Sequence, residues 1–376
     1  MEYRTMPHTG DAFSTIAIGG ANLSALSDGE MAQLLDCAEE HGLNVIDLAV
    51  DSSQPFSPLG AALRGRREKM RLSLHLGLNF NDQGQYLRTQ DIPTVRKTLE
   101  WELKTLRTDY ADIGYLHYID TPEDYERIFS SGLFEYALRL RREGRIRHLG
   151  FDSHNVAMAD KMLDTGEMDV FLFSINPAYD LDPVTHNPLE EDLSELDALN
   201  VAKDREALYR RAEKLGVAIN VMKPLAAGRL LNARTSPFGR VMTIPQCIQY
   251  CLDRPAVMSC MVGVRNAPDL RDVLHYYEAS ADERDYSFIA QARPKEMLGQ
   301  CMYCNHCQPC PAGIDIAAVH KFLDLAKADD ALAHEHYRAL EHKASDCLGC
   351  GSCEDNCPFQ VSVREKMKEA EKLFDA

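Results

Sequence analysis

The sequence predicts a (β/α)8 barrel followed by a small C-terminal domain. Short apolar runs alternate with helical stretches up to about residue 280, and eight of the twelve cysteines stand in two short runs after residue 300. Alternating strand and helix signals are typical of α/β folds, and eight such units form a closed parallel barrel. We expect the barrel to span residues 1–285 and an α-helical, ferredoxin-like domain with two clusters to span residues 286–376.

Eight short apolar runs are the candidate strands of the barrel. They are Thr15–Gly19, Leu43–Asp47, Met70–Leu76, Asp112–Leu116, Ile146–Gly150, Val170–Ser174, Val217–Met222 and Val257–Val262. The helical stretches between them include Ser27–His41, Pro93–Leu106, Pro122–Glu143 and Asp204–Leu215. Ser27 and Glu30 have the spacing of a capping box, which marks the start of the first helix. The active site of such a barrel lies at the carboxyl ends of the strands.

Three further segments have distinct compositions. Asn176–Val201, after the sixth strand, is long and acidic and lacks a clear period, so it is either a lid over the barrel mouth or a plain surface insertion. Residues 281–300 are polar and should connect the barrel to the cysteine-rich region. Between the cysteine runs, Ile316–Leu340 is typical of one or two helices.

The two cysteine runs predict iron–sulfur clusters. The second run has the spacing C-x2-C-x2-C-x3-C-P, which is typical of two-cluster ferredoxins, and the first run is one residue shorter between its third and fourth cysteines. In those ferredoxins the fourth cysteine of a run binds the other cluster. This rule predicts one [4Fe–4S] site formed by Cys301, Cys304, Cys307 and Cys357, and a second formed by Cys347, Cys350, Cys353 and Cys310.

Other interpretations of the cysteines fit less well. Zinc sites usually combine two separated C-x2-C pairs, and disulfides require an oxidising compartment, for which the sequence shows no export signal. The four remaining cysteines lie in apolar strand or helix settings and are expected in the core; they are Cys37, Cys247, Cys251 and Cys260. Cys247 and Cys251 lie one helical turn apart, so half a metal site is the alternative for that pair.

The overall charge bears on partners and location. The formal net charge is −17, which argues against nonspecific binding to nucleic acid or anionic membranes. The N-terminal residues lack the apolar run of a signal peptide, and no stretch reaches the length of about 18 apolar residues that a membrane helix needs. We therefore expect a cytoplasmic protein.

Five segments carry a family resemblance. They are the opening MEYRTMPHTGDAFSTIAIGG, NVIDLA at Asn44–Ala49, TDYADIGYLHYID at Thr108–Asp120, EGRIRHLGFDSHN at Glu143–Asn155 and INVMKPLAAGRLL at Ile219–Leu231. In this order the segments resemble the aldo-keto reductases, specifically the bacterial branch with a C-terminal 2[4Fe–4S] ferredoxin-like domain. The resemblance covers nearly the whole chain and implies a barrel oxidoreductase that uses NADPH.

The resemblance also implies a catalytic tetrad of Asp, Tyr, Lys and His, in which the tyrosine protonates the carbonyl oxygen as hydride arrives. The aspartate falls on Asp47 and the histidine on His117. The tyrosine position is occupied by Ser52 and the lysine position by His75, so half of the tetrad is replaced.

The cofactor positions depart from the family pattern in part. Family members commonly hold the nicotinamide carboxamide with Ser-Asn after the fifth strand and a Gln on the sixth. Here Asp152 and Ser153 occupy the first two positions and are the expected binding residues, whereas Leu172 stands at the glutamine position and cannot donate or accept a hydrogen bond. The phosphate end is better kept, and its implied cofactor-binding residues are Lys223, Leu225, Gly228, Gly263, Arg265 and Asn266. Arg265 could pair with a 2′-phosphate, or it is a plain surface arginine.

The remaining side chains suggest an imidazole as the acid. His75, His117 and Asp47 end adjacent strands, and an imidazole titrates near neutral pH. We expect His75 or His117 to deliver the proton, with Tyr115, Tyr118 and Tyr179 as further candidate donors. Two alternatives remain open: the site has lost activity and His75 only fills space, or two histidines with Asp47 and Asp152 bind a divalent iron or zinc ion.

The leading functional hypothesis is an iron–sulfur oxidoreductase. Its barrel would act on a small organic substrate, and its two clusters would pass electrons to a ferredoxin or another redox protein. The replaced positions weaken the case for NADP(H). The alternatives are an electron-transfer subunit with a silent barrel and a non-redox lyase with structural clusters.

Overall fold

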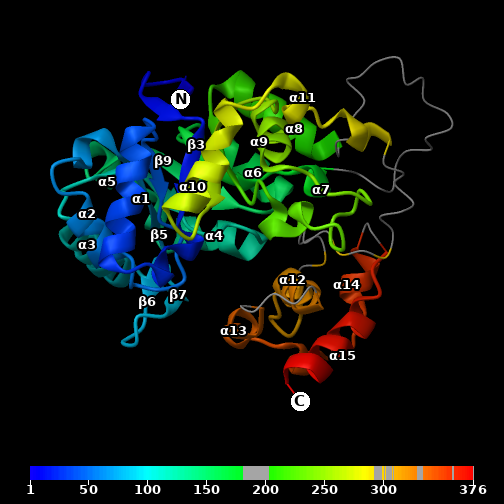
Figure 1. Cartoon of the computed structure of the whole chain (residues 1–376). Coiled ribbons are helices and arrows are strands. Elements are labelled where there is room, and N and C mark those ends of the chain that lie inside the picture. The colour runs from blue at the N-terminus through cyan, green and yellow to red at the C-terminus, as the bar shows by residue number, and fades with distance from the viewer. Residues whose placement is uncertain are drawn as a thin grey trace. The chain divides into compact units, whose positions relative to one another are not determined.

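The structure is a computed structural model that describes residues 1–180, 203–291, 299, 301, 307, 309–327, 333–357 and 360–375. The chain divides into two compact units (Figure 1). The first comprises residues 1–175, 207–224 and 248–284, and the second comprises residues 176–206, 225–247 and 285–376. Two segments of the expected barrel region thus group with the C-terminal residues, and the expected boundary at residue 285 stays a prediction.

Eight parallel strands of the first unit form a closed barrel. They are β3 (Ile16–Gly19), β4 (Val45–Asp47), β5 (Arg71–Leu76), β8 (Ala111–Leu116), β9 (Ile146–Ser153), β10 (Val170–Ser174), β11 (Ala218–Met222) and β12 (Val257–Gly263). Each strand pairs in parallel with the next one in this order, and β12 pairs with β3 to close the ring. All eight predicted strands are therefore confirmed, with ends that differ by a few residues at most.

Two hairpins accompany the barrel. At the N-terminus, β1 (Tyr3–Thr5) and β2 (Ala12–Ser14) pair antiparallel. Met6 and Phe13 from this hairpin pack into the same buried cluster as Ala17, Val45 and Tyr115 of the barrel strands, so the hairpin contributes to the core. A second hairpin, β6 (Leu78–Phe80) and β7 (Tyr86–Arg88), follows β5 directly.

Helices connect the strands around the barrel. Those of residues 1–180 are α1 (Asp28–Glu40), α2 (Phe56–Ala62), α3 (Ile92–Leu106), α4 (Pro122–Ser130), α5 (Leu133–Arg142), α6 (Val156–Leu163) and α7 (Pro177–Asp180). Short 3₁₀ helices cover Gly20–Ala25 (η1) and Arg67–Lys69 (η2). The capping box of Ser27 and Glu30 is confirmed, because each residue's side chain accepts a hydrogen bond from the other's backbone N–H.

The helical stretch predicted over Pro122–Glu143 is confirmed, but it is not one continuous helix. The chain forms α4 and α5 instead, separated at Gly132, which has φ 78° and ψ 11°. This left-handed conformation interrupts a helix, and glycine adopts it without the steric cost that a Cβ atom imposes.

The later helices complete the two units. They are α8 (Lys203–Leu215), η3 (Ala226–Leu231), α9 (Ile244–Leu252), α10 (Ala267–Leu274), η4 (His275–Tyr277), α11 (Ala281–Arg284), η5 (Ser287–Gln291), α12 (Ile316–Lys327), α13 (Ala333–Arg338), η7 (Ala344–Asp346), α14 (Ser352–Asp355) and α15 (Val363–Phe374). Two helices, α12 and α13, confirm the helical prediction between the cysteine runs.

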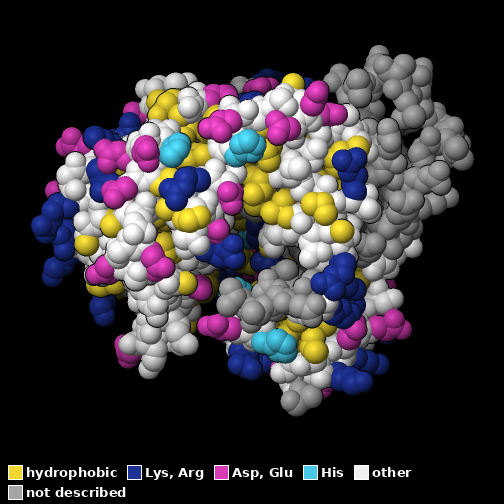
Figure 2. Space-filling model, in the orientation of Figure 1, with side chains coloured by type: hydrophobic (Ala, Val, Ile, Leu, Met, Phe, Trp, Pro, Cys, Tyr) yellow, Lys and Arg dark blue, Asp and Glu magenta, His cyan; other side chains and the backbone are white. Residues whose placement is uncertain are grey.

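Parts of two sequence predictions lie outside the described residues. The acidic segment is described only from Asn176 to Asp180, and the polar connection only to residue 291 and at residue 299. Among the described helices, none combines the length and the apolar character that a membrane span requires. Figure 2 shows acidic and basic side chains interspersed on the face that it draws.

Candidate active site and cysteine pocket

Four predicted polar residues meet at the carboxyl ends of four neighbouring strands. Asp47 ends β4, His75 is the penultimate residue of β5, His117 follows β8, and Asp152 lies near the end of β9. Asp47, His75 and Asp152 are buried, with 2–3% of their surface exposed, and His117 is half-buried. This is the end of a (β/α)8 barrel at which active sites form.

These side chains form one continuous hydrogen-bonded chain. His75 Nε2 lies 3.0 Å from Asp47 Oδ1, and His75 Nδ1 lies 2.8 Å from Asp152 Oδ2. The same Asp152 oxygen lies 2.8 Å from His117 Nδ1. His117 Nε2 in turn lies 2.8 Å from the hydroxyl oxygen of Tyr86. The second Asp152 oxygen, Oδ1, accepts a hydrogen bond from the Tyr118 backbone N–H at 2.8 Å.

The hydrogen bonds define the protonation state of His75. An ionised carboxylate can only accept, so a histidine with a carboxylate at each nitrogen must donate from both and is an imidazolium. Burial by itself would lower the pKa of His75, but the charge of Asp47 and the hydrogen bonds to Asp152 and Asp47 raise it to about 10. His75 is therefore a fixed buried cation at neutral pH.

Asp152 is the counterpart of this cation. Burial by itself would raise its pKa, but the charge of His117 and the hydrogen bonds from His117 and His75 hold the pKa of Asp152 well below its usual range. Because both of its oxygens already accept hydrogen bonds, Asp152 is part of the histidine network. A contact between Asp152 and a nicotinamide carboxamide, which the sequence suggested, stays a prediction.

The geometry bears on the metal alternative. One ligand atom each from His75, His117 and Asp152 lies within 4.8 Å of the others. An imidazolium has no free lone pair, so an ion at this position would have to displace a proton that two carboxylates hold on His75. The network is satisfied by protons alone, and we therefore favour the interpretation without an ion.

The position that matches the family tyrosine lies in a strand-like segment. The Ser52 hydroxyl is buried and has no hydrogen-bond partner among the described residues. Its backbone forms an antiparallel bridge with Gln85 of the second hairpin. Leu172, at the expected glutamine position, is buried in the barrel core.

The other predicted cofactor residues lie at strand and helix ends. Ser153 donates a hydrogen bond to the Ile119 carbonyl at 2.6 Å, and Lys223 follows β11 with φ 58°. Gly263 ends β12, and Asn266 caps α10 by accepting from the Asp269 N–H at 2.8 Å.

The remaining candidate cofactor-binding residues are Arg265, Leu225 and Gly228, and they differ in their surroundings. The Arg265 side chain is 70% exposed and pairs with Asp269 through Nε at 2.7 Å. Leu225 and Gly228 belong to the second unit, where Gly228 has φ 84°.

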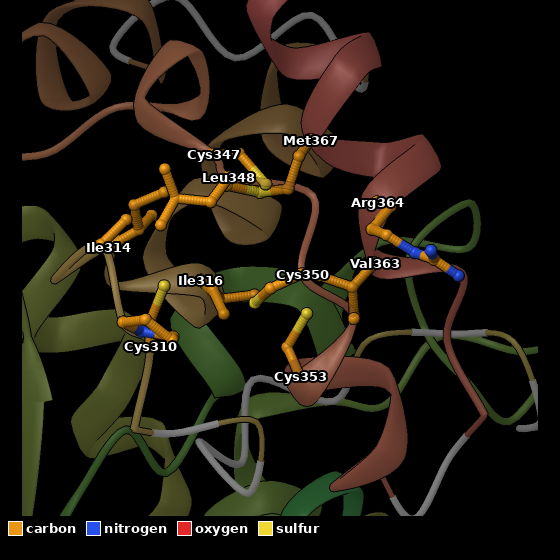
Figure 3. Close-up of a pocket in the computed structure, with 13 residues that line it drawn as sticks. Cys310, Ile314, Ile316, Cys347, Leu348, Cys350, Cys353, Val363, Arg364 and Met367 are labelled. Atoms are coloured by element: carbon orange, nitrogen blue, oxygen red, sulfur yellow. The ribbon is translucent and has the colours of Figure 1, made fainter.

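Four thiols of the second unit surround one pocket. Cys310 of the first run and Cys347, Cys350 and Cys353 of the second line it together. In Figure 3 their sulfur atoms face the same space. The other lining side chains include Ile314, Ile316, Leu348, Val363, Arg364 and Met367. This set of cysteines is the one that the crossed ferredoxin rule predicts for the second cluster.

The other predicted ligands are described in part. Cys301 and Cys357 are half-buried and Cys307 is buried, whereas Cys304 lies outside the described residues. Within the second unit, the buried Arg229 donates a hydrogen bond from Nη1 to the Cys301 carbonyl. The cysteines outside the two runs are buried, as expected for core residues: Cys37, Cys247, Cys251 and Cys260.

Tyr86 is the functional candidate that the sequence reasoning missed. It belongs to β7, so its contact with His117 depends on the hairpin. The polar turn Asn81-Asp82-Gln83-Gly84 between two short apolar stretches is a hairpin signal that could have pointed to it.

The closed barrel, with polar side chains at the carboxyl ends of its strands, is typical of (β/α)8 enzymes. Comparison with known proteins identifies the family. The aldo/keto reductase family model matches residues 15–243, which is more than half of the chain. The chain therefore belongs to the aldo/keto reductase family. It is an oxidoreductase of this family.

Two curated relatives come from Bacillus subtilis (strain 168). "Uncharacterized oxidoreductase YrpG" is 23% identical over 324 residues, which cover 75% of this chain and 93% of that protein. "Aldo-keto reductase YhdN" is 26% identical over 190 residues, which cover 48% of this chain and 54% of that protein.

Solved structures support the fold. The aldo-keto reductase AKR11C1 from Bacillus halodurans, in its holo form, superposes with a TM-score of 0.60 at 20% identity and covers 78% of this chain and 96% of that one. An aldo/keto reductase from Klebsiella pneumoniae, in complex with NADP and acetate, superposes with a TM-score of 0.54 at 16% identity and covers 78% of this chain and 96% of that one.

Proposed function

We propose that this oxidoreductase couples redox chemistry on a small organic substrate at the barrel mouth to two [4Fe–4S] clusters held by the C-terminal cysteines. The substrate would be a carbonyl compound or its alcohol, as the family chemistry implies. Electrons would be exchanged with a ferredoxin or another redox protein in the cytoplasm.

The observation that carries the cluster proposal is the pocket lined by Cys310, Cys347, Cys350 and Cys353. Thiolates are the usual protein ligands of [4Fe–4S] clusters, and apolar surroundings with cysteines from two separated runs suit such a site. Cys301, Cys304, Cys307 and Cys357 would hold the other cluster. When bound, [4Fe–4S] clusters exchange single electrons, with potentials set by their surroundings.

The barrel residues would hold and move protons. Support comes from the chain of hydrogen bonds from Asp47 through His75 and Asp152 to His117. The His75 imidazolium would supply the fixed positive charge that the family places on a lysine. Asp152 would orient His117 and hold the proton on its Nδ1, which leaves Nε2 directed away from the carboxylate. His117 would therefore be the histidine that takes part in proton transfer.

NADP(H) is the candidate hydride cofactor of the barrel. The Klebsiella pneumoniae neighbour is a complex with NADP and acetate, and the strand-end residues Lys223, Gly263, Arg265 and Asn266 match the family positions for the phosphate end of this cofactor. Fluorescence titration of NADPH against the anaerobic protein tests this part. Quenching with micromolar affinity supports it. An absence of binding combined with normal cluster reduction would favour the electron-carrier alternative.

Iron analysis tests the cluster part directly. Anaerobically purified protein should contain about eight iron atoms and as many sulfide ions per chain, and dithionite should produce a low-temperature EPR signal. Cys310→Ser should lose about half of the iron, because it removes one ligand of one cluster. Cys37→Ala, which removes a buried thiol of the barrel unit, should keep all of it. Zinc in place of iron would contradict the proposal.

A further inference from the structure

The second hairpin is attached to the segment that carries the replaced tyrosine position. The Ser53 N–H donates to the Gly84 carbonyl at 2.8 Å, and the Tyr86 N–H donates to the Asp51 carbonyl at 3.0 Å. Together with the bridge between Ser52 and Gln85, these hydrogen bonds align β7 with residues 51–53. The hairpin therefore brings its own side chains to the place where the family has its tyrosine.

Tyr86 is the side chain that this alignment places against His117. Its hydroxyl oxygen lies 2.8 Å from His117 Nε2, and the two rings meet edge to face, with centroids 5.8 Å apart. Tyr86 is half-buried, whereas His75 and Asp152 of the same network are buried. Burial nevertheless raises the pKa of Tyr86, which keeps the phenol protonated until a stronger base appears.

We propose that Tyr86 replaces the missing family tyrosine as the proton donor to the substrate oxygen. This inference rests on the proposed carbonyl reduction. When bound, reduced nicotinamide would supply the hydride that forms a C–H bond at the carbonyl carbon while the C=O π bond breaks. The Tyr86 hydroxyl proton then moves to the carbonyl oxygen, and the alcohol results.

His117 completes the proton balance. Its Nδ1 carries a proton because it faces the acceptor Asp152, so the state of Nε2 decides the direction of the bond to Tyr86. With Nε2 protonated, His117 donates to the Tyr86 oxygen, and the phenol proton points to the substrate. After the transfer, the Tyr86 phenolate takes the Nε2 proton, which solvent replaces.

The three tyrosines that the sequence offered as donors fit this role less well. The Tyr115 hydroxyl is fully buried and accepts a hydrogen bond from Asn220 at 2.8 Å, so it faces the core. The Tyr118 ring lies 6.0 Å from the His117 ring by centroids and stacks against Arg88. Tyr179, the third donor expected from the sequence, belongs to the second unit.

The test compares Tyr86→Phe with Tyr125→Phe. Both changes remove one hydroxyl and keep the ring, and Tyr125 lies on the outer helix α4 against Phe129. With NADPH and 4-nitrobenzaldehyde, we expect Tyr86→Phe to lower kcat at least about 100-fold, the scale of general acid catalysis. KM and NADPH affinity should change less than about threefold, because neither substrate nor cofactor binding depends on the proton. Tyr125→Phe should match the unaltered chain.

Two measurements distinguish a failure of the Tyr86 proposal from a failure of the proposed function. In the cofactor-free protein, the ¹⁵N resonance of His117 Nε2 should shift in Tyr86→Phe and stay unchanged in Tyr125→Phe. A Tyr86→Phe enzyme that turns over at the rate of the unaltered chain would overturn the proposal. An unaltered chain that binds no NADPH would instead contradict the proposed function and remove this inference with it.

Discussion

His75 stands where the family pattern has a lysine, and this replacement changes how the site holds its positive charge. A lysine ammonium is a point charge on a flexible stem, whereas the His75 ring donates from two fixed nitrogens to Asp47 and Asp152. Because the ring connects the carboxylate at the end of β4 to the one near the end of β9, it fixes the position of Asp152, which in turn holds His117. The imidazole of His75 thus belongs to a network that joins the ends of four strands, β4, β5, β8 and β9.

Removing this cation should destabilise the barrel in a pH-dependent way. The pKa of His75 is raised to about 10 in the folded protein, against about 6.5 in an unfolded chain. Its stabilisation is therefore fully present below pH 6.5 and is lost as the pH rises towards 10. We expect His75→Gln to cost about 3–5 kcal/mol at pH 6, and urea denaturation should show this difference shrinking up to pH 10. The exposed His8→Gln serves as the control, and a constant difference across this range would refute the assignment of charge.

A second buried group, Glu102, should also reduce stability as the pH rises, but its removal should stabilise the protein. Glu102 on α3 is 3% exposed, and burial raises its pKa to about 8, with the charge of His75 opposing this shift. An unfolded glutamate ionises near pH 4.3, so stability is lost as the pH rises from about 4.3 to 8. Glu102→Gln should therefore be more stable than the unaltered chain at pH 9, by about 1–3 kcal/mol.

The control for Glu102 lies on the same helix. Glu100 is exposed and pairs with Arg145 on the surface, so Glu100→Gln should change the free energy of unfolding by less than about 1 kcal/mol. Equal effects of the two substitutions at pH 9 would show that burial of Glu102 is not the cause.

The sequence predicted which side chains meet at the site only where a residue's position along a strand determines its location in the barrel. Asp47, His75, His117 and Asp152 were predicted to meet because each follows or ends an apolar run. Tyr86 was missed because its place depends on the pairing of residues 51–53 with a hairpin, which is a tertiary contact without a motif. The protonation state of His75 could be assigned only from the distances between its two ring nitrogens and the carboxylates of Asp47 and Asp152. The sequence alone does not show that a carboxylate lies at each nitrogen.

At the scale of elements, the strands were easier to predict than the helices. Parallel strands buried on both faces are continuous apolar runs, which a sequence shows directly. The sequence predicts one helical stretch over residues 122–143, yet the chain forms two helices separated at Gly132. A periodic pattern shows which side of a helix is apolar. The interruption at Gly132 depends instead on how the two short helices pack on the barrel.

Two glycines in these elements should respond differently to alanine. At Gly60 in α2, an added Cβ would collide with the Thr105 carbonyl oxygen of α3, so the two helices would have to separate. At Gly132 nothing lies within 4 Å of the added Cβ, and only the positive φ opposes it. We expect Gly60→Ala to cost about 3 kcal/mol or more and Gly132→Ala about 1–2 kcal/mol. Thermal denaturation measures both, and the reverse order would contradict this account of α2 and α3.

At the scale of the whole molecule, the sequence predicted a barrel and a cysteine-rich region, and the structure describes two units. The two units do not follow the chain in two simple blocks, because residues 176–206 and 225–247 group with the C-terminal residues. Such grouping depends on contacts between segments far apart in the sequence. The cysteine spacing, in contrast, already predicted that Cys310 joins three thiols of the second run.

The most direct test of the proposed iron–sulfur chemistry is an anaerobic crystal structure with an anomalous difference map at the iron edge. We predict two compact iron peaks per chain. One should be bound by Cys310, Cys347, Cys350 and Cys353, and the other by the remaining cysteines of the two runs. A map without iron at these thiols, or with a single zinc ion between them, would contradict the proposed iron–sulfur oxidoreductase.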